Sequence, residues 1–361
     1  MPDPDRVTGD VVSFTTPARV ITVATGAASD VTHEAATLTG TLEELTGYDT
    51  ADCSFEWREA GTSTWTETDP ETRPSTGEYT ADLSGLDTET EYEFRARGTA
   101  SHDGEQAEST GEPATFTTDA EPLPEWQTYV ADEGAAEESE IHVYEADAAG
   151  PVTVALNIHA SEQTGVTALE DMLTEWPHPV ESGTMIVWPT PCPSAAANET
   201  RTCNGEDLNE AFDLTDGPQT SVAQTIEDEL VARNAEYLVD LHTRTELYES
   251  GGEGHAIFPS DDGTTRPISE AAVDEVNANY AFDPSEEWSV GNTVDEAGAQ
   301  NDGMLATYAW ETHGIHSQIG ITWSAWNEAD QIEQHKRVVA TTLSEAGHQL
   351  GSGPSNLLTT N

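Results

Sequence analysis

The arrangement of apolar residues changes at a short acidic segment that contains two prolines, 119–125. Before this segment, apolar and polar residues alternate in short runs separated by Gly, Asp, Ser and Pro, which predicts β-strands joined by turns. After it, short continuous apolar runs alternate with segments of helical period, which predicts buried strands covered by helices. We therefore expect an all-β domain over 19–118, a linker over 119–125 and an α/β domain over 126–352.

The chain is strongly acidic along its whole length. Its 361 residues include 69 acidic and 12 basic side chains, which gives a formal net charge of -57. Nine Trp and nine Tyr argue for packed cores rather than a disordered polyanion. Repulsion among the carboxylates is screened in molar salt, so we expect a halophilic type of protein that loses its circular dichroism signal in dilute buffer. An unchanged spectrum would contradict this. The charge also argues against nucleic-acid binding, because phosphates are repelled.

The ends of the chain give expectations about its origin and location. No apolar run reaches 18 residues, so we expect no membrane span. The segment 9–16 resembles 111–118, the last strand of the β-domain, and we interpret 1–18 as the end of a truncated upstream β-repeat. The first residues lack signal-peptide features, which a start downstream of the true one would explain. We expect an extracellular or cell-envelope protein from a high-salt environment.

Three cysteines have different surroundings in the sequence. Cys53 lies in a strand pattern and is expected to be a small core residue. Cys192 and Cys203 lie in one loop-like region, so either a local disulfide or two free thiols fits the sequence.

The β-domain resembles a fibronectin type III repeat. The resemblance rests on three segments: Ala-Thr-Leu-Thr-Gly at 36–40, the run from Leu83 to Ala96, and Ala-Thr-Phe-Thr-Thr at 114–118. The part from Leu86 to Tyr92 matches the corner between two strands of that family, where a Tyr hydroxyl is tied to the upstream backbone. The resemblance implies a β-sandwich that serves as a spacer or adhesion module, which could contact a cell surface or polymer.

In the α/β domain, buried strands are predicted at 152–157, 183–188, 237–241 and 319–322, and helices at 168–176, 221–234, 267–280, 303–312 and 327–347. The last residues, 353–361, are expected to be a tail. The fold class is therefore an N-terminal all-β sandwich followed by a mixed sheet flanked by helices. Ligands in such sheets bind at the carboxyl ends of the strands.

Two strand ends carry a candidate metal site. His159 and Glu162 follow the first strand, and His242 lies just past the end of the third strand, two residues after Asp240. Two imidazoles and one carboxylate form a three-ligand set for one catalytic Zn²⁺ ion, and Asp240 is placed to orient its neighbouring imidazole. Loop histidines beside surface acids are the alternative interpretation, and other divalent metals would accept the same ligands.

The same elements resemble the zinc carboxypeptidase family and its relatives, the succinylglutamate desuccinylase and aspartoacylase deacylases. That family combines H-x-x-E, an Arg, the motif G-x-D-L-N-R-x-F and a strand ending in D-x-H, and the resemblance covers about 126–350. It implies a zinc site at His159, Glu162 and His242. It further implies that Arg201 polarises the scissile carbonyl and that Asn209 helps to hold the substrate carboxylate. Without it, Arg201 would form a surface ion pair with the abundant acids, and Asp207, Leu208 and Asn209 would form a helix-capping turn.

Two positions depart from the family pattern. Glu210 replaces the Arg that grips the free carboxylate of the substrate, so we expect rejection of a C-terminal carboxylate and a substrate with an amine or no charge at that point. Thr322 stands where the catalytic Glu is expected, and a Thr cannot take a proton from water at neutral pH. Glu328, in a loop after the last strand, is the replacement we consider first, and Glu246 is weaker.

These observations predict a zinc-dependent hydrolase that cleaves an amide bond in a peptide or an N-acyl amino acid. The alternative is a zinc-binding protein of the same fold that binds a ligand without turnover.

Overall fold

The computed structural model describes residues 10, 12–13, 15, 18–248, 251–260, 262–294 and 303–358. The chain separates into two compact units, Met1–Pro122 and Leu123–Asn361. Most of the segment 9–16, which we interpreted as part of an upstream repeat, lies outside the described residues. Within the described ranges, no helix is long and apolar enough to cross a membrane.

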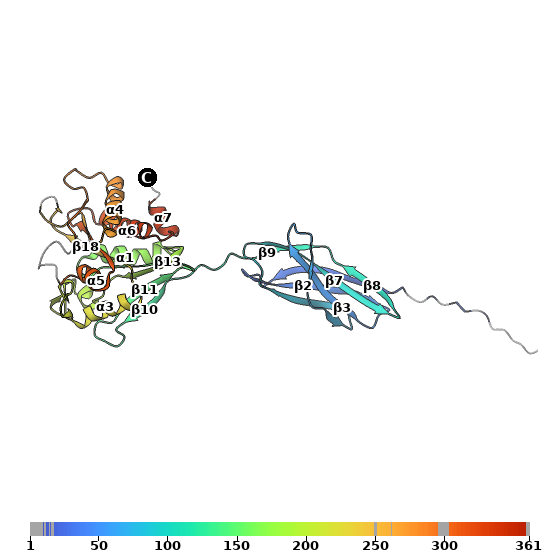
Figure 1. Ribbon diagram of the computed structural model, residues 1–361. Helices are drawn as coiled ribbons and strands as arrows, with labels where there is room; N and C mark the ends of the chain where they lie inside the picture. Colours follow the sequence, from blue (N-terminus) through green and yellow to red (C-terminus); the bar gives the residue numbers. More distant parts are fainter. Residues whose placement is uncertain are drawn as a thin grey trace, which may run out of the picture. The chain divides into compact units, whose positions relative to one another are not determined.

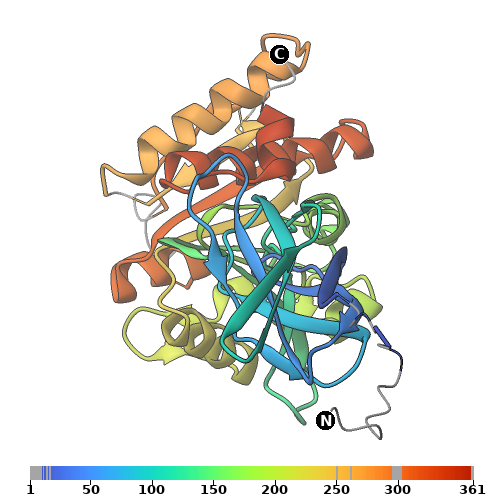
Figure 2. The same cartoon turned by 90° about the vertical axis from the view of Figure 1, so that its right-hand side faces the viewer.

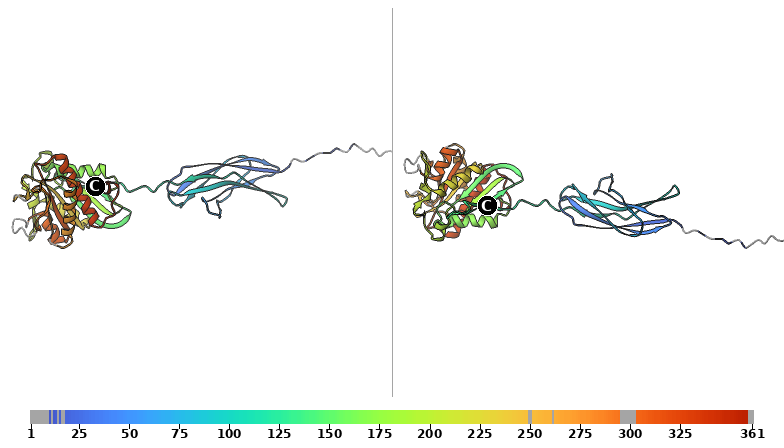
Figure 3. Two further views of the ribbon diagram at one scale, coloured as in Figure 1. Left: turned by 90° about the horizontal axis from the view of Figure 1, so that it is seen from above. Right: turned by 90° about the horizontal axis from the view of Figure 1, so that it is seen from below.

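Two antiparallel sheets enclose the core of the first unit (Figure 3). One sheet has the order β1 (Val20–Ser29), β2 (Ala35–Thr46), β6 (Gly77–Ser84). The other has the order β4 (Thr66–Glu67), β3 (Ala51–Glu59), β7 (Glu91–His102), β8 (Glu105–Thr110), with β5 (Glu71–Arg73) beside β3 and β9 (Ala114–Thr117) beside β7. Inward residues such as Leu38, Phe55 and Phe94 are fully buried, as the alternating pattern requires.

Two details of the first unit were expected from the sequence. The Tyr92 hydroxyl accepts a hydrogen bond from the backbone N–H of Asp87 at 2.9 Å, which is the predicted tie at the corner before β7. Cys53 is buried in the core, and this burial raises the pKa of its thiol to about 11. The fibronectin type III identity of the unit stays a prediction.

An eight-stranded mixed sheet forms the centre of the second unit. Its order is β10 (Gln127–Ala131), β11 (Ser139–Glu145), β13 (Ser182–Trp188), β12 (Ala148–Leu156), β18 (Tyr237–Arg244), β21 (His316–Trp323), β19 (Ala256–Pro259), β20 (Ser289–Val290). The central strands β13, β12, β18 and β21 are parallel, and antiparallel pairs occur towards the edges. Two small hairpins lie outside this sheet: β14 (Thr202–Cys203) with β15 (Glu206–Asp207), and β16 (Phe212–Asp213) with β17 (Gly217–Pro218).

Helices cover both faces of this sheet (Figure 1). One face carries α1 (Gln163–Glu175), α4 (Thr265–Asn279), α6 (Glu328–Glu345) and α7 (Ser352–Leu358); the other carries α2 (Pro193–Ala197), α3 (Ser221–Ala232) and α5 (Leu305–His313). Figure 2 shows α4 in orange beside α6 in red on the same side. Along β12, Val154 and Leu156 pack in one apolar cluster and Ala155 in the other, because successive strand residues face opposite ways. The predicted mixed sheet with flanking helices is confirmed.

The structure adds elements that the sequence pattern did not indicate. The strands β10 and β11 extend the sheet on one side, and β19 and β20 extend it on the other. Within the expected tail, 353–358 belong to α7 (Ser352–Leu358). Leu357 and Leu358 pack against the apolar cluster beneath α6, so this short segment is held by burial rather than by helical propensity.

Candidate metal centre

Adjacent parallel strands fix the two segments that carry the site. Leu156, the last residue of β12, lies opposite Asp240 of β18. Just beyond, the side-chain amide of Asn157 donates to the Leu241 carbonyl at 2.7 Å. The Ile158 N–H donates to Asp240 Oδ1 at 3.2 Å. The chain leaving β12 is therefore fastened to β18 before it turns.

A tight turn then brings His159 and Glu162 to the same side. The Glu162 N–H donates to the His159 carbonyl at 2.8 Å, and Glu162 is the residue directly before α1. Gly165, in the first turn of α1, lies against the side-chain amide of Asn157, and a Cβ at this position would collide with it. The glycine thus lets α1 begin close to the strand end.

Ligand atoms of three residues converge at this point. His159 Nδ1 lies 3.2 Å from His242 Nδ1 and 3.2 Å from Glu162 Oε1, and His242 Nδ1 lies 3.2 Å from Glu162 Oε2. All three residues are buried. Tetrahedral zinc with Zn–N bonds of 2.0–2.1 Å would separate neighbouring ligand atoms by about 3.3 Å. The three residues therefore fit the ion that the sequence predicts.

Carboxylates hold the outer nitrogens of both rings. His159 Nε2 lies 2.7 Å from Asp207 Oδ1, and His242 Nε2 lies 2.8 Å from Asp240 Oδ2. A carboxylate can only accept, so each Nε2 carries the proton and each Nδ1 turns a lone pair inward. Those lone pairs face each other and the Glu162 oxygens. A buried cluster made only of acceptors needs a cation, either a proton or a metal ion.

The ionisation of these groups follows from the same contacts. Burial opposes the charge on Glu162, but the positive charge of a protonated His242 and the contacts with both imidazoles hold the pKa of Glu162 well below the ordinary value. Burial alone would lower the pKa of His242, yet Asp240 and Glu162 raise it to about 9. Burial would raise the pKa of Asp207, but contacts with His159 and Arg201 outweigh this effect and lower the pKa to about 2. Without a metal, a proton on His242 would supply the missing cation.

Two arginines contact Glu162 from different elements. Arg201 Nη1 lies 2.8 Å from Glu162 Oε1, and Arg244 Nη1 lies 2.6 Å from the same oxygen. Arg201 also binds Asp207 at 2.8 Å, and Arg244 binds Glu253 at 2.7 Å. Arg201 was expected near the site from the sequence. Arg244 was missed, although its position two residues after His242 on β18 offered a signal.

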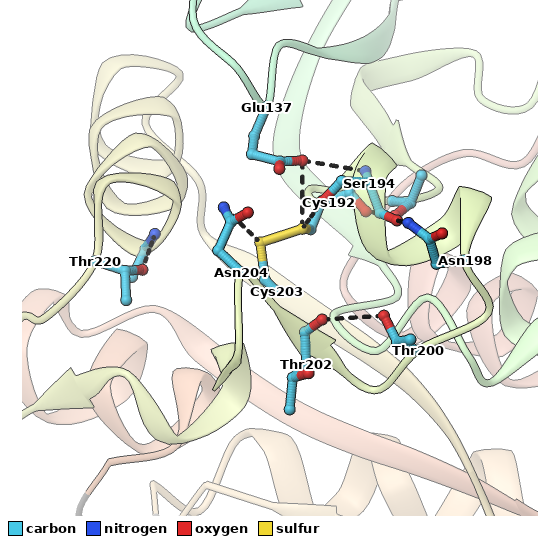
Figure 4. The surroundings of a disulfide bond; sticks show 11 residues. Glu137, Cys192, Ser194, Asn198, Thr200, Thr202, Cys203, Asn204 and Thr220 are labelled. Carbon is cyan, nitrogen blue, oxygen red and sulfur yellow. Dashed lines mark hydrogen bonds between the residues drawn. A yellow bond between two sulfur atoms is a disulfide. The ribbon is translucent and has the colours of Figure 1, made fainter.

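A disulfide closes the loop that carries Arg201. Cys192 and Cys203 are bonded, which answers the question that the sequence left open (Figure 4). Glu137 Oε2 lies 3.4 Å from Cys192 Sγ and accepts from the Ser194 N–H at 3.1 Å. Glu137, Cys192 and Cys203 form a second group of possible metal ligands, but both sulfurs are already in the disulfide. The bond instead anchors the hairpin β14–β15, which places Asp207 against His159.

The remaining substrate-binding candidates, Asn209 and Glu210, follow Asp207 closely in the sequence. Asn209 is buried, and its Oδ1 accepts from the Leu305 N–H at 3.1 Å, so this oxygen fixes the start of α5. Its side-chain N–H₂ group is the part that could meet a ligand. Glu210 is exposed in the 3₁₀ turn η1 (Leu208–Glu210).

Thr322 and Glu328, at or near the position expected for the catalytic base, have different surroundings. Thr322 is buried, and its hydroxyl lies 3.0 Å from Thr243 Oγ1 and 3.2 Å from His335 Nε2. Glu328 is not in a loop, as we had expected, but is the exposed first residue of α6. It shares with Glu162 the lining of a hollow of about 380 Å³. Neither His159 nor His242 lines this hollow.

Other titratable residues near Thr322 in the sequence lie away from the centre in the fold. His316 is the first residue of β21, at the opposite end from Thr322, and it contacts Asp262 at 2.8 Å. His313 ends α5 and contacts Glu227 at 2.8 Å. Glu246 is exposed beyond the end of β18.

Part of the second unit is similar to known proteins in sequence and in fold. Residues 150–290 match the family described as the succinylglutamate desuccinylase/aspartoacylase catalytic domain. Two solved structures of the cell shape determinant protein Csd4 from Helicobacter pylori share the fold. A Csd4 variant has a TM-score of 0.50 and 16% identity, covering 60% of this chain and 58% of that chain. The tripeptide-bound form has a TM-score of 0.50 and 17% identity, covering 61% and 59%. No curated protein matches the chain.

The matched region covers the candidate metal ligands but not the position expected for the catalytic base. It includes His159, Glu162, Arg201, Asn209 and His242 and ends before Thr322. The chain spans less than two thirds of the Csd4 chains, and the likeness to them concerns the fold. The second unit therefore contains a region similar to the succinylglutamate desuccinylase/aspartoacylase catalytic domain, and it shares its fold with Csd4.

Proposed function

We propose that the second unit is a metal-dependent amide hydrolase with one zinc ion held by His159, Glu162 and His242. The observation that carries the proposal is the buried cluster of acceptor atoms, whose 3.2 Å separations suit a tetrahedral ion. Its outer nitrogens are held by Asp207 and Asp240, the arrangement that fixes ligand orientation in zinc sites.

The chain's own residues divide the remaining work. A divalent cation bound there would lower the pKa of water to about 7 and polarise a carbonyl oxygen. Arg201, whose side chain is 41% exposed, can turn towards that oxygen and stabilise the charge that develops on it. Asn209 can donate from its side-chain amide to the substrate, since its oxygen is already used on Leu305.

Glu328 is our candidate for moving the proton. Its carboxylate is exposed and borders the same hollow as Glu162, so water can reach both groups. Thr322 cannot replace it as a base, because its hydroxyl has no useful basicity at neutral pH and is engaged with other side chains.

The substrate that we propose is a peptide or an N-acyl amino acid. In this scheme the first unit is a spacer that holds the enzyme at a cell surface or on a polymer. An extracellular or cell-envelope location agrees with the Cys192–Cys203 disulfide, since such bonds persist in oxidising compartments.

Metal analysis and turnover test this proposal together. Protein prepared in molar salt should contain one zinc ion per chain and should hydrolyse some members of a panel of peptides and N-acyl amino acids. Glu328→Gln should lower kcat by on the order of 100-fold or more while zinc content stays unchanged. Glu333→Gln, further along α6, serves as the matched control and should retain activity. A protein without zinc would overturn the proposal.

One observation favours a second function. The late strand β21 presents Thr322, not a carboxylate, at the position where the family places its base. The protein could then bind zinc and a ligand without turnover. Stoichiometric zinc, tight ligand binding and no hydrolysis across the whole panel would support this function over the enzyme.

A further inference from the structure

The Cys192–Cys203 disulfide lies against a buried carboxylate that the metal centre does not use. Glu137, in the loop between β10 and β11, places its Oε2 3.4 Å from Cys192 Sγ (Figure 4). All three side chains are buried. We propose that they form a second, redox-gated metal site, which binds a soft divalent cation such as Zn²⁺ or Cd²⁺ once the disulfide is reduced. This site is separate from the proposed function and does not depend on it.

The Glu137 carboxylate has no cationic side chain beside it. Within the part of the chain that the structure describes, no Arg, Lys or His forms an ion pair with Glu137, and its Oε2 accepts from the Ser194 N–H at 3.1 Å. A buried carboxylate is costly without a positive partner. The neighbouring disulfide cannot be that partner, because its sulfurs carry neither a proton nor a positive charge. The oxidised pair therefore leaves the charge of Glu137 uncompensated, whereas two thiols or a bound cation would compensate it.

The three side chains have the spacing that a metal ion requires. The Glu137 oxygen and both sulfurs lie within 4.8 Å of one another. Tetrahedral zinc, with Zn–S bonds of about 2.3 Å and Zn–O bonds of about 2.0 Å, separates a sulfur from an oxygen by about 3.5 Å. The distance of 3.4 Å between Glu137 Oε2 and Cys192 Sγ already matches this value. After reduction, only the two sulfurs have to move apart.

Both cysteines lie on short elements. Cys192 directly precedes α2, which has five residues, and Cys203 ends β14, which has two. Such elements make few hydrogen bonds of their own, so they open locally more readily than the strands of the central sheet. A small reductant can therefore reach the disulfide. A cation bound afterwards links the same two segments that the disulfide linked.

Formation of the site takes two balanced steps. A water-soluble phosphine reduces the disulfide: the S–S bond breaks, and one water molecule gives its oxygen to the phosphine oxide and one proton to each sulfur. A divalent cation then displaces both thiol protons into solution and bonds to two sulfurs and one carboxylate oxygen. Water can complete the four ligands of the ion. Because the sulfurs dominate this set, Mg²⁺ and Ca²⁺ should not compete.

Cadmium titration of the full chain in molar salt tests this site separately from the metal centre. The oxidised protein first receives one equivalent of zinc. Thiolate-to-cadmium charge-transfer absorption then reports sulfur ligands alone, and the metal centre has none. We expect one cadmium ion per chain with this absorption after phosphine treatment, and none before it. Glu137→Gln should weaken cadmium binding to the reduced protein by on the order of 10-fold or more, because one ligand is lost. Glu140→Gln, an exposed position on β11, is the matched control and should bind as the wild type does.

Further controls separate the site from unspecific binding by thiols. Cys203→Ser should lose tight cadmium binding, whereas Cys53→Ala, which removes the buried free thiol of the first unit, should retain it. Circular dichroism should show that the reduced protein keeps its fold, and the reduced chain in guanidinium measures the cadmium affinity of unfolded thiols.

Four results would overturn the proposal: loss of the fold on reduction, no cadmium bound to the reduced protein, equal affinity of the wild type and Glu137→Gln, or equal affinity of the folded and unfolded chains. None of them bears on zinc at the metal centre, which the oxidised protein binds independently. Failure of this site and failure of the proposed function are therefore distinguishable.

Discussion

Two pairs of buried histidines in the second unit differ in their neighbours. His159 and His242 face Glu162, and their outer nitrogens contact Asp207 and Asp240. The other pair is equally buried but contacts no carboxylate among the described residues. His255 donates from Nδ1 to the Glu286 carbonyl at 2.6 Å and stacks on Trp288, and His335 contacts the Thr322 hydroxyl at 3.2 Å.

The difference in neighbours reverses the direction in which the histidine pKa is shifted. Asp240 and Glu162 overcome the effect of burial and raise the pKa of His242 to about 9. Burial lowers the pKa of His255 to about 4 and that of His335 to about 3, with nearby histidine charges adding to the effect at His335. A buried histidine is therefore a candidate metal ligand because of the carboxylates around it, since burial by itself produces a neutral core residue.

The largest expected difference between the pairs is in zinc affinity. His242→Ala should weaken zinc binding by at least 100-fold, because two protein ligands do not hold the ion. His255→Gln, in the other pair, should bind zinc as the wild type does. Competition with a chromophoric chelator measures both affinities. Equal losses in the two variants would mean that the pairs do not differ as described.

His255 and His242 should also respond to pH in opposite directions. His255 has a folded pKa below its ordinary value of 6.5, so protonation favours the unfolded chain. Its contribution is fully present above about pH 6.5 and is lost as the pH falls to 4, by up to about 3 kcal/mol. Guanidinium titrations between pH 4 and 7 would measure this loss, and His255→Gln should reduce the slope. A slope that the variant leaves unchanged would assign the acid sensitivity to other groups.

In the metal-free protein, His242 should act with the other sign. Its folded pKa lies above 6.5, so its contribution is fully present below that pH and is lost as the pH rises towards 9. After zinc is removed by a chelator, the free energy of unfolding should therefore fall between pH 7 and 9. Stability that is constant over this range would contradict the raised pKa.

A smaller effect concerns the carboxylates behind the ligands. Asp240→Asn and Asp207→Asn should each weaken zinc binding about 10- to 100-fold, because the imidazoles lose the partner that orients them. Asp262→Asn is the matched control, since Asp262 contacts His316 at 2.8 Å at the far end of β21. Zinc affinity of the control should match the wild type even if its stability is lower.

The sequence predicted the two-part organisation and the end of β12 to within one residue, because strand and helix periods are local properties. It placed the end of β18 at 241, whereas the strand continues to Arg244 and includes His242. It also predicted that His159 and His242 would meet, since neighbouring parallel strands end at the same edge of a sheet. Asp240 was recognised as a partner because it is two residues from His242 on the same strand.

Contacts made through folding of distant segments were not predictable in this way. Asp207 was interpreted as part of a capping turn, and it does accept from the Asn209 N–H at 3.1 Å, but it also contacts His159 across 48 positions. Arg244 carries no motif, and its contact with Glu162 depends on how α1 begins. His255 is buried by aromatic residues that come from several segments of the chain. The sequence therefore did not show that the surroundings of His255 differ from those of His159.

Anomalous diffraction at the zinc edge, from crystals of the full chain grown in molar salt with zinc, tests the metal centre most directly. The account predicts one strong peak in the second unit, about 2.0–2.2 Å from His159 Nδ1, His242 Nδ1 and a Glu162 oxygen. A peak at other residues, or no peak while zinc is present in the crystal, would contradict it.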